Sequence, residues 1–225
     1  MKEHWCIPAA SAEFVARRED LRDWYEDPDD PMRPRVGFDE RPCQWLADRR
    51  EPLPMIPEPP ARFDDEDTRH GTCHLFSMVE PVRGWRQITV TPRRTKREFA
   101  YCMQERVAVH FPKAEQIRVV LDNLSTHTPG ALYDVFPPAD ARRILRKLAC
   151  HRTPVHGSWL KMAEVELAVL ARQCLNRRVP DRAAMTREPS AWHARRNHRQ
   201  AVIDWRFPTG DARIKWKRLY PKASR

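Results

Sequence analysis

The sequence predicts an α/β fold in which a mixed β-sheet is flanked by helices. After a first helical segment there are three short runs of β-type residues, and helical and strand patterns then alternate along the rest of the chain. This order of elements is typical of a sheet covered by helices. A chain of 225 residues with 41% hydrophobic residues can bury one good core. We therefore expect one main domain.

The first part of the chain predicts a helix followed by proline-rich connections. Residues 11–26 have the spacing of an amphipathic helix, with Phe14, Leu21 and Trp24 on one side. Nine of the 21 prolines fall between residues 28 and 60. Because proline disrupts helices and sheet ladders, we expect only short strands and turns there. One of these strands is predicted over residues 35–40.

The middle of the chain predicts a hairpin, a helix and a buried strand. Two β-type runs, residues 73–79 and 85–91, are separated by a four-residue loop that contains Gly84. Helical spacing follows over residues 96–111. The run IRVVL at 117–121 is continuously apolar, as in central strands of a sheet.

Two further helices and a short strand complete the predicted fold. A second helix is expected to begin at Pro137-Pro138, since proline suits a first helical turn. The segment CHRT at 150–153 is a candidate short strand, and a third helix is predicted from Ser158 to about Asn176. The complete order of strands and helices fits a ribonuclease H-like fold, although other mixed α/β folds share parts of it.

The charge distribution points to a polyanionic partner. The net charge is +10, but residues 1–70 carry −7 and the remaining 155 residues carry +17. Residues 182–225 hold 12 Lys or Arg against 3 Asp or Glu, among them Arg195 and Arg196. Interleaved aromatic residues favour phosphate binding by this segment. The alternative is a solvated basic tail.

The sequence shows no sign of membrane insertion or export. No apolar stretch reaches the roughly 18 residues that span a bilayer, and the N-terminus lacks the apolar core of a signal peptide. The six cysteines form no CxxC pair and are expected to be reduced. A cytoplasmic protein is the expectation.

Three acidic residues lie where the predicted sheet would bring them together. Asp39 ends the first strand, Asp122 follows the central strand, and Glu164 lies early in the third helix beside its apolar stripe. Converging carboxylates repel one another unless cations neutralise them, and oxygen ligands select Mg²⁺ or Mn²⁺. Two such ions can activate a water or a 3′-hydroxyl for phosphodiester chemistry. Each acid taken alone is more often a surface carboxylate.

Several blocks of the sequence resemble a known family. They are VGFDERP at 36–42, HGTCHLF at 70–76, VVLDNLSTHTPGALYDVFPPADARR at 119–143, TPVHGSWLKMAEVELAVLARQCLNRRVPD at 153–181 and DARIKWKRLYP at 211–221. Together they resemble the bacterial insertion-sequence transposases of the mariner superfamily. The resemblance covers nearly the whole chain and is most specific around Asp122 and Glu164.

The resemblance implies a catalytic domain of the DDE type, with Asp39, Asp122 and Glu164 as the metal-binding triad. It also implies Mg²⁺ or Mn²⁺ as cofactor, as two ions, and double-stranded DNA as substrate, cleaved and joined at transposon ends. A homodimer is the expected assembly for bringing two ends together. The expected organisation is a helix and linker remnant over 1–34, the catalytic domain over 35–180 and a basic helix and tail over 181–225.

Supporting roles are predicted for residues around the triad, each beside an ordinary structural alternative. Asn123 and His127 are candidates to position a phosphate or a metal-bound water, or they simply stabilise the turn. Trp159 is a candidate to stack on a base, or it packs in the core. Arg142, Arg143 and Lys147 are candidates to line a DNA channel, as are Arg195 and Arg196, or they form solvated faces of their helices.

Three departures from the family pattern favour a second hypothesis. Lys161 stands where the family usually has Asn, and Pro189 interrupts a segment expected to be helical, at a cost of about 3 kcal/mol. The helix-turn-helix modules that family members carry ahead of this domain are also expected to be missing. The alternative is therefore a truncated, catalytically inactive remnant that binds DNA without sequence preference. A structural protein unrelated to DNA would require the three acids to lie apart.

Lys161 lies three residues before Glu164 and so on nearly the same helical face. Its ammonium is therefore expected to reach the metal site. A positive charge there would oppose a divalent cation, whereas a neutral asparagine would not.

Overall fold

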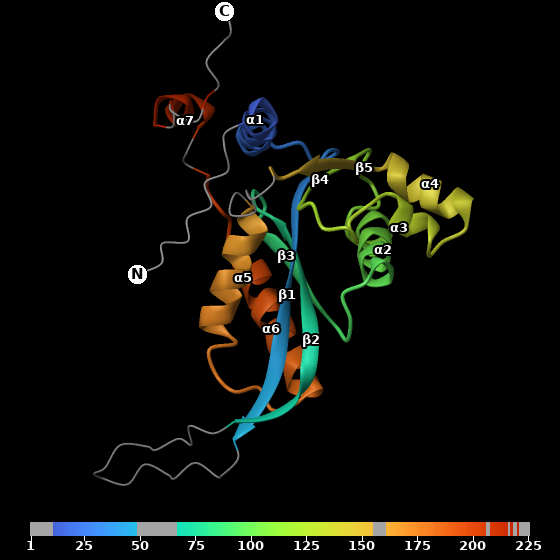
Figure 1. The fold of residues 1–225 in the computed structure, drawn as a ribbon, viewed down its shortest axis with the longest axis vertical. Helices are drawn as coiled ribbons and strands as arrows, with labels where there is room; N and C mark the ends of the chain where they lie inside the picture. The colour runs from blue at the N-terminus through green and yellow to red at the C-terminus, as the bar shows by residue number, and fades with distance from the viewer. Residues whose placement is uncertain are drawn as a thin grey trace, which may run out of the picture.

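A five-stranded mixed sheet forms the centre of the computed structural model (Figure 1). The structure describes residues 11–48, 67–154, 161–205, 208–215, 217 and 220. The strand order is β3-β2-β1-β4-β5. Strands β1 (Arg35–Asp48), β2 (Asp67–Glu80) and β3 (Trp85–Thr91) form an antiparallel meander, and β4 (Ile117–Leu121) and β5 (Leu148–Arg152) continue it in parallel with β1. The predicted mixed α/β sheet is confirmed.

Helices cover both faces of this sheet (Figure 1). One face carries α2 (Lys96–Glu105), its π-helical continuation η1 (Arg106–His110), α3 (Gly130–Tyr133) and α4 (Pro138–Arg146). The other carries α5 (Met162–Gln173) and α6 (Arg182–His198). Helices α1 (Ala12–Glu26) and α7 (Thr209–Lys215) lie together at one end of the sheet.

Each face of the sheet has its own apolar core. Phe38, Phe76 and Val119 of the sheet pack against Phe99 of α2 and Ile144 of α4. On the opposite face, α5 and α6 bury a second cluster against β2 and β3, formed by Leu75, Ile88, Leu167, Leu170, Met185 and Trp192. The alternation of side chains along the central strands supplies both cores at once.

Strand β1 is longer than the proline content predicts. It runs for 14 residues and contains Pro42, whereas only a short strand over 35–40 was expected. The reason is the uneven pairing of its two edges. Strand β4 pairs only with Arg35, Val36 and Gly37, so one edge of β1 is free of ladder partners at Pro42. A proline there interrupts no ladder on that side.

Two helices also differ from the sequence prediction. Helix α6 continues through Pro189, so the predicted interruption is wrong. The helix is stabilised by Asp181, which caps its first turn, and by Met185 and Trp192, which are buried in the core. The predicted second helix, α4, ends at Arg146, and the pattern of apolar residues predicted it to include Leu148, which begins β5 instead. The predicted start of the third helix at Ser158 lies outside the described residues.

Helix α1 is joined to the sheet by packing and by hydrogen bonds from Arg35 of β1 to the carbonyls of Trp24 and Tyr25. Leu21, Trp24 and Tyr25 pack against Val120 of β4 and Met162 of α5. The Tyr25 ring stacks on Trp205, with ring centroids 4.5 Å apart. Residues from both ends of the chain therefore support the start of α5. None of the described helices combines the length and the apolar composition that crossing a bilayer requires.

Candidate functional site

Two neighbouring parallel strands deliver two aspartates to the same level of the sheet. Gly37 of β1 is paired with Val120 of β4, and each aspartate lies two residues further along its strand direction. Asp39 is therefore in β1, and Asp122 directly follows the last residue of β4. Because the strands are parallel, the two carboxylates lie on the same side of the molecule.

Helix α5 crosses β1 closely and carries the third carboxylate. A Cβ added to Gly37 would lie only 3.4 Å from the Cβ of Ala163, so the glycine allows the helix to approach the strand. Glu164 follows Ala163 in the first turn of α5. The hydroxyl of Tyr25 accepts a hydrogen bond of 3.0 Å from the backbone N–H of Met162, which fixes the start of the helix.

Asp39, Asp122, Glu164 and Lys161, here called the acidic cluster, line one pocket of about 350 Å³. The Lys161 ammonium lies 2.6 Å from Oδ1 of Asp39 and 3.3 Å from Oδ2 of Asp122. The lysine side chain is only 2% exposed. The expected approach of Lys161 to the carboxylates is therefore observed, with the ammonium between the two aspartates.

Burial and neighbouring charges compete at these groups. Burial raises the pKa of Asp39 despite the ammonium beside it. Burial also raises the pKa of Asp122, but the His127 hydrogen bond and the Lys161 charge outweigh it and hold this pKa below its usual range. For Glu164, burial and the neighbouring Asp39 both raise the pKa. The two aspartates raise the pKa of Lys161 in spite of its burial, so the lysine keeps its charge at neutral pH.

A buried histidine extends the cluster on its inner side. Nδ1 of His127 lies 2.6 Å from Oδ1 of Asp122, and Nε2 lies 3.0 Å from Oε2 of Glu40. Burial lowers the pKa of His127, but its two carboxylate partners outweigh burial and raise it. Arg94 lies 3.7 Å from the other oxygen of Glu40. Charges therefore alternate from Asp39 through Lys161 and the histidine to this arginine.

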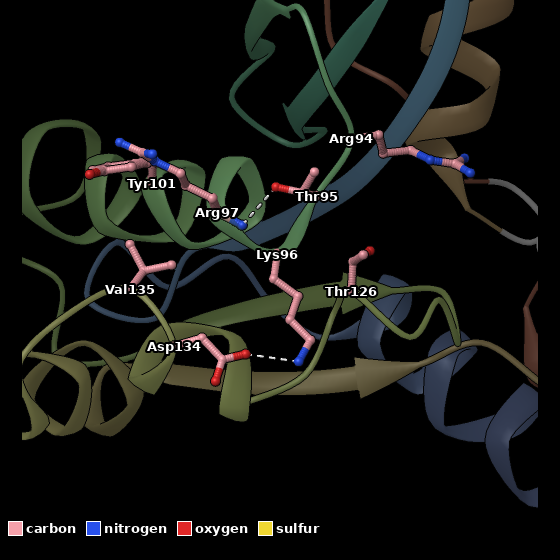
Figure 2. A pocket seen from close by; sticks show the side chains of 8 residues that line it. All are labelled: Arg94, Thr95, Lys96, Arg97, Tyr101, Thr126, Asp134 and Val135. Atoms are coloured by element: carbon pink, nitrogen blue, oxygen red, sulfur yellow. Dashed lines mark hydrogen bonds and ion pairs between the residues drawn. The ribbon is translucent and has the colours of Figure 1, made fainter.

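Arg94 also lines a second, basic pocket of about 670 Å³, shown in Figure 2. Arg94, Lys96 and Arg97 project from the β3–α2 connection and the first turn of α2, and Thr126 faces them from the segment after β4. Lys96 forms an ion pair of 2.8 Å with Asp134, the one acidic residue in the lining. The basic pocket, defined by these lining residues, carries a net positive charge beside the acidic cluster.

The predicted supporting residues take different positions around the site. His127 contacts the triad aspartate directly. Asn123 instead donates a hydrogen bond of 2.7 Å to the carbonyl of Thr153 and accepts one from Arg17, so it ties two segments together. Trp159 lies outside the described residues.

The cations predicted to bind DNA are spread over both faces of the molecule. Arg142 and Arg143 are exposed on α4, where Arg143 lies 3.2 Å from Asp140. Lys147 donates a hydrogen bond to the carbonyl of Pro112. On α6, Arg195 is exposed, whereas Arg196 is held by Glu166.

A second charge cluster lies beneath α5. Nε of Arg86 lies 2.7 Å from Oε1 of Glu166, and Nε of Arg196 lies 2.8 Å from the same oxygen. The side chains of Arg86 and Glu166 are 0% and 1% exposed. These three residues, the arginine–glutamate cluster, join β3, α5 and α6.

Sequence reasoning did not identify Glu40, Arg94 or Glu166. Glu40 neighbours Asp39 in β1, so strand alternation directs it to the opposite side of the sheet, where His127 lies. Arg94 belongs to the run PRRTKR at 92–97, a local concentration of positive charge that could have identified the basic pocket. Glu166 has no distinguishing signal, because a glutamate within a helix is usually solvated.

The donor set of the acidic cluster suits a hard divalent cation. Three carboxylates converge on one pocket, and the Lys161 ammonium already lies within hydrogen-bond distance of two of them, as a stand-in for a cation. Carboxylate oxygens are the ligands that Mg²⁺ and Mn²⁺ prefer. A group formed by Glu40, Asp122 and His127 is compact enough to hold an ion as well. In that group the histidine already bridges the carboxylates, which favours a positioning role.

Comparison with known proteins gives a family and a fold. The family model described as DDE superfamily endonuclease matches residues 34–186. The Mos1 transposase paired-end complex with left transposon end has a TM-score of 0.58, at 14% identity, over 97% of this chain and 65% of that chain. The Mos1 mariner paired end complex with Mn has a TM-score of 0.55, at the same identity and coverage.

The Mos1 strand transfer complex has a TM-score of 0.54 at 14% identity, over 89% of this chain and 62% of that chain. No curated protein matches the sequence. The chain thus spans about two thirds of the length of the Mos1 transposase chains. At this identity the similarity shows the fold alone, which is the ribonuclease H-like sheet of that transposase and confirms the predicted fold class.

Proposed function

We propose that this chain, which belongs to the DDE superfamily of endonucleases, is the catalytic part of a transposase that cleaves DNA and transfers strands at transposon ends. The convergence of Asp39, Asp122 and Glu164 on one pocket carries the proposal. We assign these three residues as the metal-binding triad. Bound Mg²⁺ or Mn²⁺ would supply Lewis-acid activation of the attacking oxygen and stabilise the leaving oxygen, and this reaction class predicts two ions.

The chain's own residues hold the carboxylates in position. Asp122 accepts hydrogen bonds through Oδ1 from the backbone N–H of Leu124 and from His127. Asp39 accepts one through Oδ1 from the backbone N–H of Glu40. These contacts fix the directions of both carboxylates before substrate arrives, which lowers the cost of ordering the site. We assign His127 as a positioning residue, because it contacts Asp122 and Glu40 from a buried position.

We also propose that the basic pocket receives the phosphodiester backbone of the substrate DNA. Arg94 lies 3.7 Å from Glu40, which neighbours the acidic cluster, and Arg97 lines the same basic pocket. Neither has a carboxylate nearer than 3.7 Å among the ion pairs of the described residues. A strand lying across both pockets would have its phosphates neutralised beside the carboxylates. The basic pocket is better placed for this than Arg196, whose charge is compensated by Glu166.

We also propose an oligomeric state and a cellular location. Joining two transposon ends requires two sites acting together, so we propose a homodimer on DNA, and the molar mass of the protein measured by light scattering with and without DNA tests it. We propose that the protein acts in the cytoplasm, where this substrate is accessible.

The catalytic proposal is tested by nicking of supercoiled DNA in Mg²⁺ or Mn²⁺. Asp122→Asn should reduce the rate by at least about 100-fold, because an amide is a poor ligand for a hard cation. The matched control is Asp140→Asn, the same change on an exposed position of α4, which should keep the wild-type rate. Equal nicking by all three proteins would remove the enzymatic assignment.

A second candidate function has one observation in its favour. The contact of Lys161 with both aspartates favours a copy that binds DNA without cleaving it. In that case DNA binding should persist while the wild-type protein shows no nicking at any Mg²⁺ or Mn²⁺ concentration. Fluorescence anisotropy in EDTA measures the binding, and the presence or absence of nicking in Mg²⁺ or Mn²⁺ separates the two functions.

The same anisotropy assay tests the basic pocket. The double variant Arg94→Gln, Arg97→Gln should bind duplex DNA about tenfold more weakly and with a smaller salt dependence, because two phosphate contacts are lost. Lys113→Gln is the control, since this exposed lysine lies before the start of β4, at the opposite end of that strand from Asp122. Unchanged affinity in the double variant would exclude the basic pocket as a DNA contact.

A further inference from the structure

Lys161 is a buried cation placed where a metal ion is expected. Its side chain is 2% exposed, and its ammonium contacts one oxygen of Asp39 and one of Asp122. It precedes α5 as the N-cap residue, yet its side chain makes no capping hydrogen bond. Asparagine, which is a good N-cap residue, would serve the helix better. The lysine side chain is therefore committed to the two carboxylates rather than to the helix.

The contacts of the carboxylate oxygens divide the pocket into an occupied part and an open part. Both oxygens of Asp122 are engaged, Oδ1 by Leu124 and His127 and Oδ2 by Lys161. Oδ1 of Asp39 receives Lys161 and the backbone N–H of Glu40. Within the described part of the chain, Oδ2 of Asp39 and the carboxylate of Glu164 make no hydrogen bond. These open oxygens line the same pocket.

The charges of the cluster agree with this division. Three carboxylates and one ammonium leave a net charge of −2, which one divalent cation neutralises. A second divalent cation would have to displace the ammonium from between the two aspartates or lie directly beside it. At such short distances the repulsion between the ammonium and a divalent cation opposes binding of the second ion strongly.

We propose that the Lys161 ammonium takes the place of one of the two cations expected at this site, so that the chain binds a single divalent ion through Asp39 and Glu164. This inference rests on the proposed function, because it takes the triad as the metal site. It assigns to the chain a tethered cation that is present without metal. The apo protein is then stabilised by its own lysine rather than by an ion.

Binding of Mn²⁺ to the intact chain in the absence of DNA tests the inference. The fraction of free Mn²⁺, measured by electron paramagnetic resonance, gives the number of ions per chain. We expect one ion for the wild type and two for Lys161→Asn, and in the variant the first ion should bind about tenfold more tightly or better. Arg41→Gln is the matched control, because it removes the same charge from an exposed position in the same pocket. It should bind one ion, like the wild type.

Thermal unfolding gives a readout that does not depend on activity. In EDTA, Lys161→Met should melt below the wild type, because the buried Asp39 and the half-buried Asp122 lose their counterion and methionine adds no helix cap. Mg²⁺ should then raise the melting temperature of the methionine variant more than that of the wild type. Equal melting temperatures of both proteins in EDTA would contradict a stabilising role for the ammonium.

The possible failures are distinguishable. Two Mn²⁺ ions in the wild type, with no gain in Lys161→Asn, would overturn the inference and leave the proposed function intact. No Mn²⁺ in any of the proteins would overturn the metal assignment of the triad and the single-ion site with it. If Lys161→Asn does not fold, the number of ions bound by the wild type alone decides between one and two.

Discussion

Helix α5 carries two glutamates, two residues apart, in opposite surroundings. Glu164 belongs to the acidic cluster, where carboxylates outnumber cations by three to one and the pocket is open. Glu166 belongs to the arginine–glutamate cluster, where one carboxylate meets two guanidinium groups and is 1% exposed. The positions differ by about 200° around the helix, so the two side chains leave it on nearly opposite sides.

This difference shows how to separate a charge cluster that binds from one that holds the fold together. In the arginine–glutamate cluster, the single buried carboxylate is paired with two guanidinium groups, and Arg86 also donates to the carbonyl of Gly84. In the acidic cluster, an excess of negative charge faces a pocket that an ion or a substrate can enter. A cluster whose carboxylates outnumber their cations and line an opening is the better candidate for function.

The largest expected effect is the loss of stability when the arginine–glutamate cluster is disrupted. Glu166→Gln should lower the free energy of unfolding by about 3–5 kcal/mol, because it leaves Arg86 buried without its counterion. Urea denaturation measures the loss. The control is Glu188→Gln, whose partner Arg177 is largely exposed and whose loss should cost under about 1 kcal/mol. A small loss for Glu166→Gln would show that the two clusters do not differ as described.

The parts of the site that the sequence predicted are those set by strand direction. The strand over 117–121 has the predicted bounds, and its apolar run indicates a central position. Once β1 and β4 are taken as neighbouring parallel strands, this pairing alone predicts that Asp39 and Asp122 lie close together. The approach of Lys161 was also predicted, but from a helical spacing that it does not have, because Lys161 is the extended N-cap residue of α5.

The unpredicted parts depend on contacts between segments far apart in the chain. Arg86, Glu166 and Arg196 come from three elements, and no local pattern distinguishes them from exposed charges. The length of β1 depends on how far β4 pairs with it, which the proline count does not show. The continuity of α6 through Pro189 depends on the burial of Trp192 in the core.

A third buried carboxylate, Glu80 in β2, is intermediate between the two clusters in how far its charge is compensated. It is 2% exposed, and its one ion-pair partner among the described residues is Arg83, at 3.4 Å. Burial raises the pKa of Glu80 to about 7, an effect that the charge of Arg83 only partly offsets. The folded protein therefore binds this proton more tightly than the unfolded chain does. Stability should fall as pH rises from about 4.5 to 7 and then level off.

Glu80→Gln should remove that pH dependence. At pH 8 the free energy of unfolding of the variant should be about 3 kcal/mol higher than that of the wild type, and near pH 4.5 the two proteins should agree. Urea denaturation at a series of pH values measures both limits. If the stability of the wild type does not fall between these pH values, the negative charge of Glu80 is compensated to the same degree as that of Glu166.

The smallest expected effect on stability belongs to Glu164, and its sign is opposite to that of Glu166. Glu164 is exposed and forms no ion pair among the described residues. Partial desolvation and Asp39 raise its pKa more than Lys161 lowers it, so its negative charge is disfavoured in the folded protein. Glu164→Gln should therefore leave stability in EDTA unchanged or raise it by up to about 1 kcal/mol, since the side chain is partly solvated and the repulsion is screened.

The same change should abolish the rise in melting temperature caused by Mg²⁺, because it removes one of the open ligands. Differential scanning fluorimetry in EDTA and in Mg²⁺ measures both effects, and Glu188→Gln again serves as the matched control, with a Mg²⁺ response equal to that of the wild type. Loss of stability in EDTA without loss of the Mg²⁺ response would place Glu164 among the residues that hold the fold together, and the contrast along α5 would then be lost.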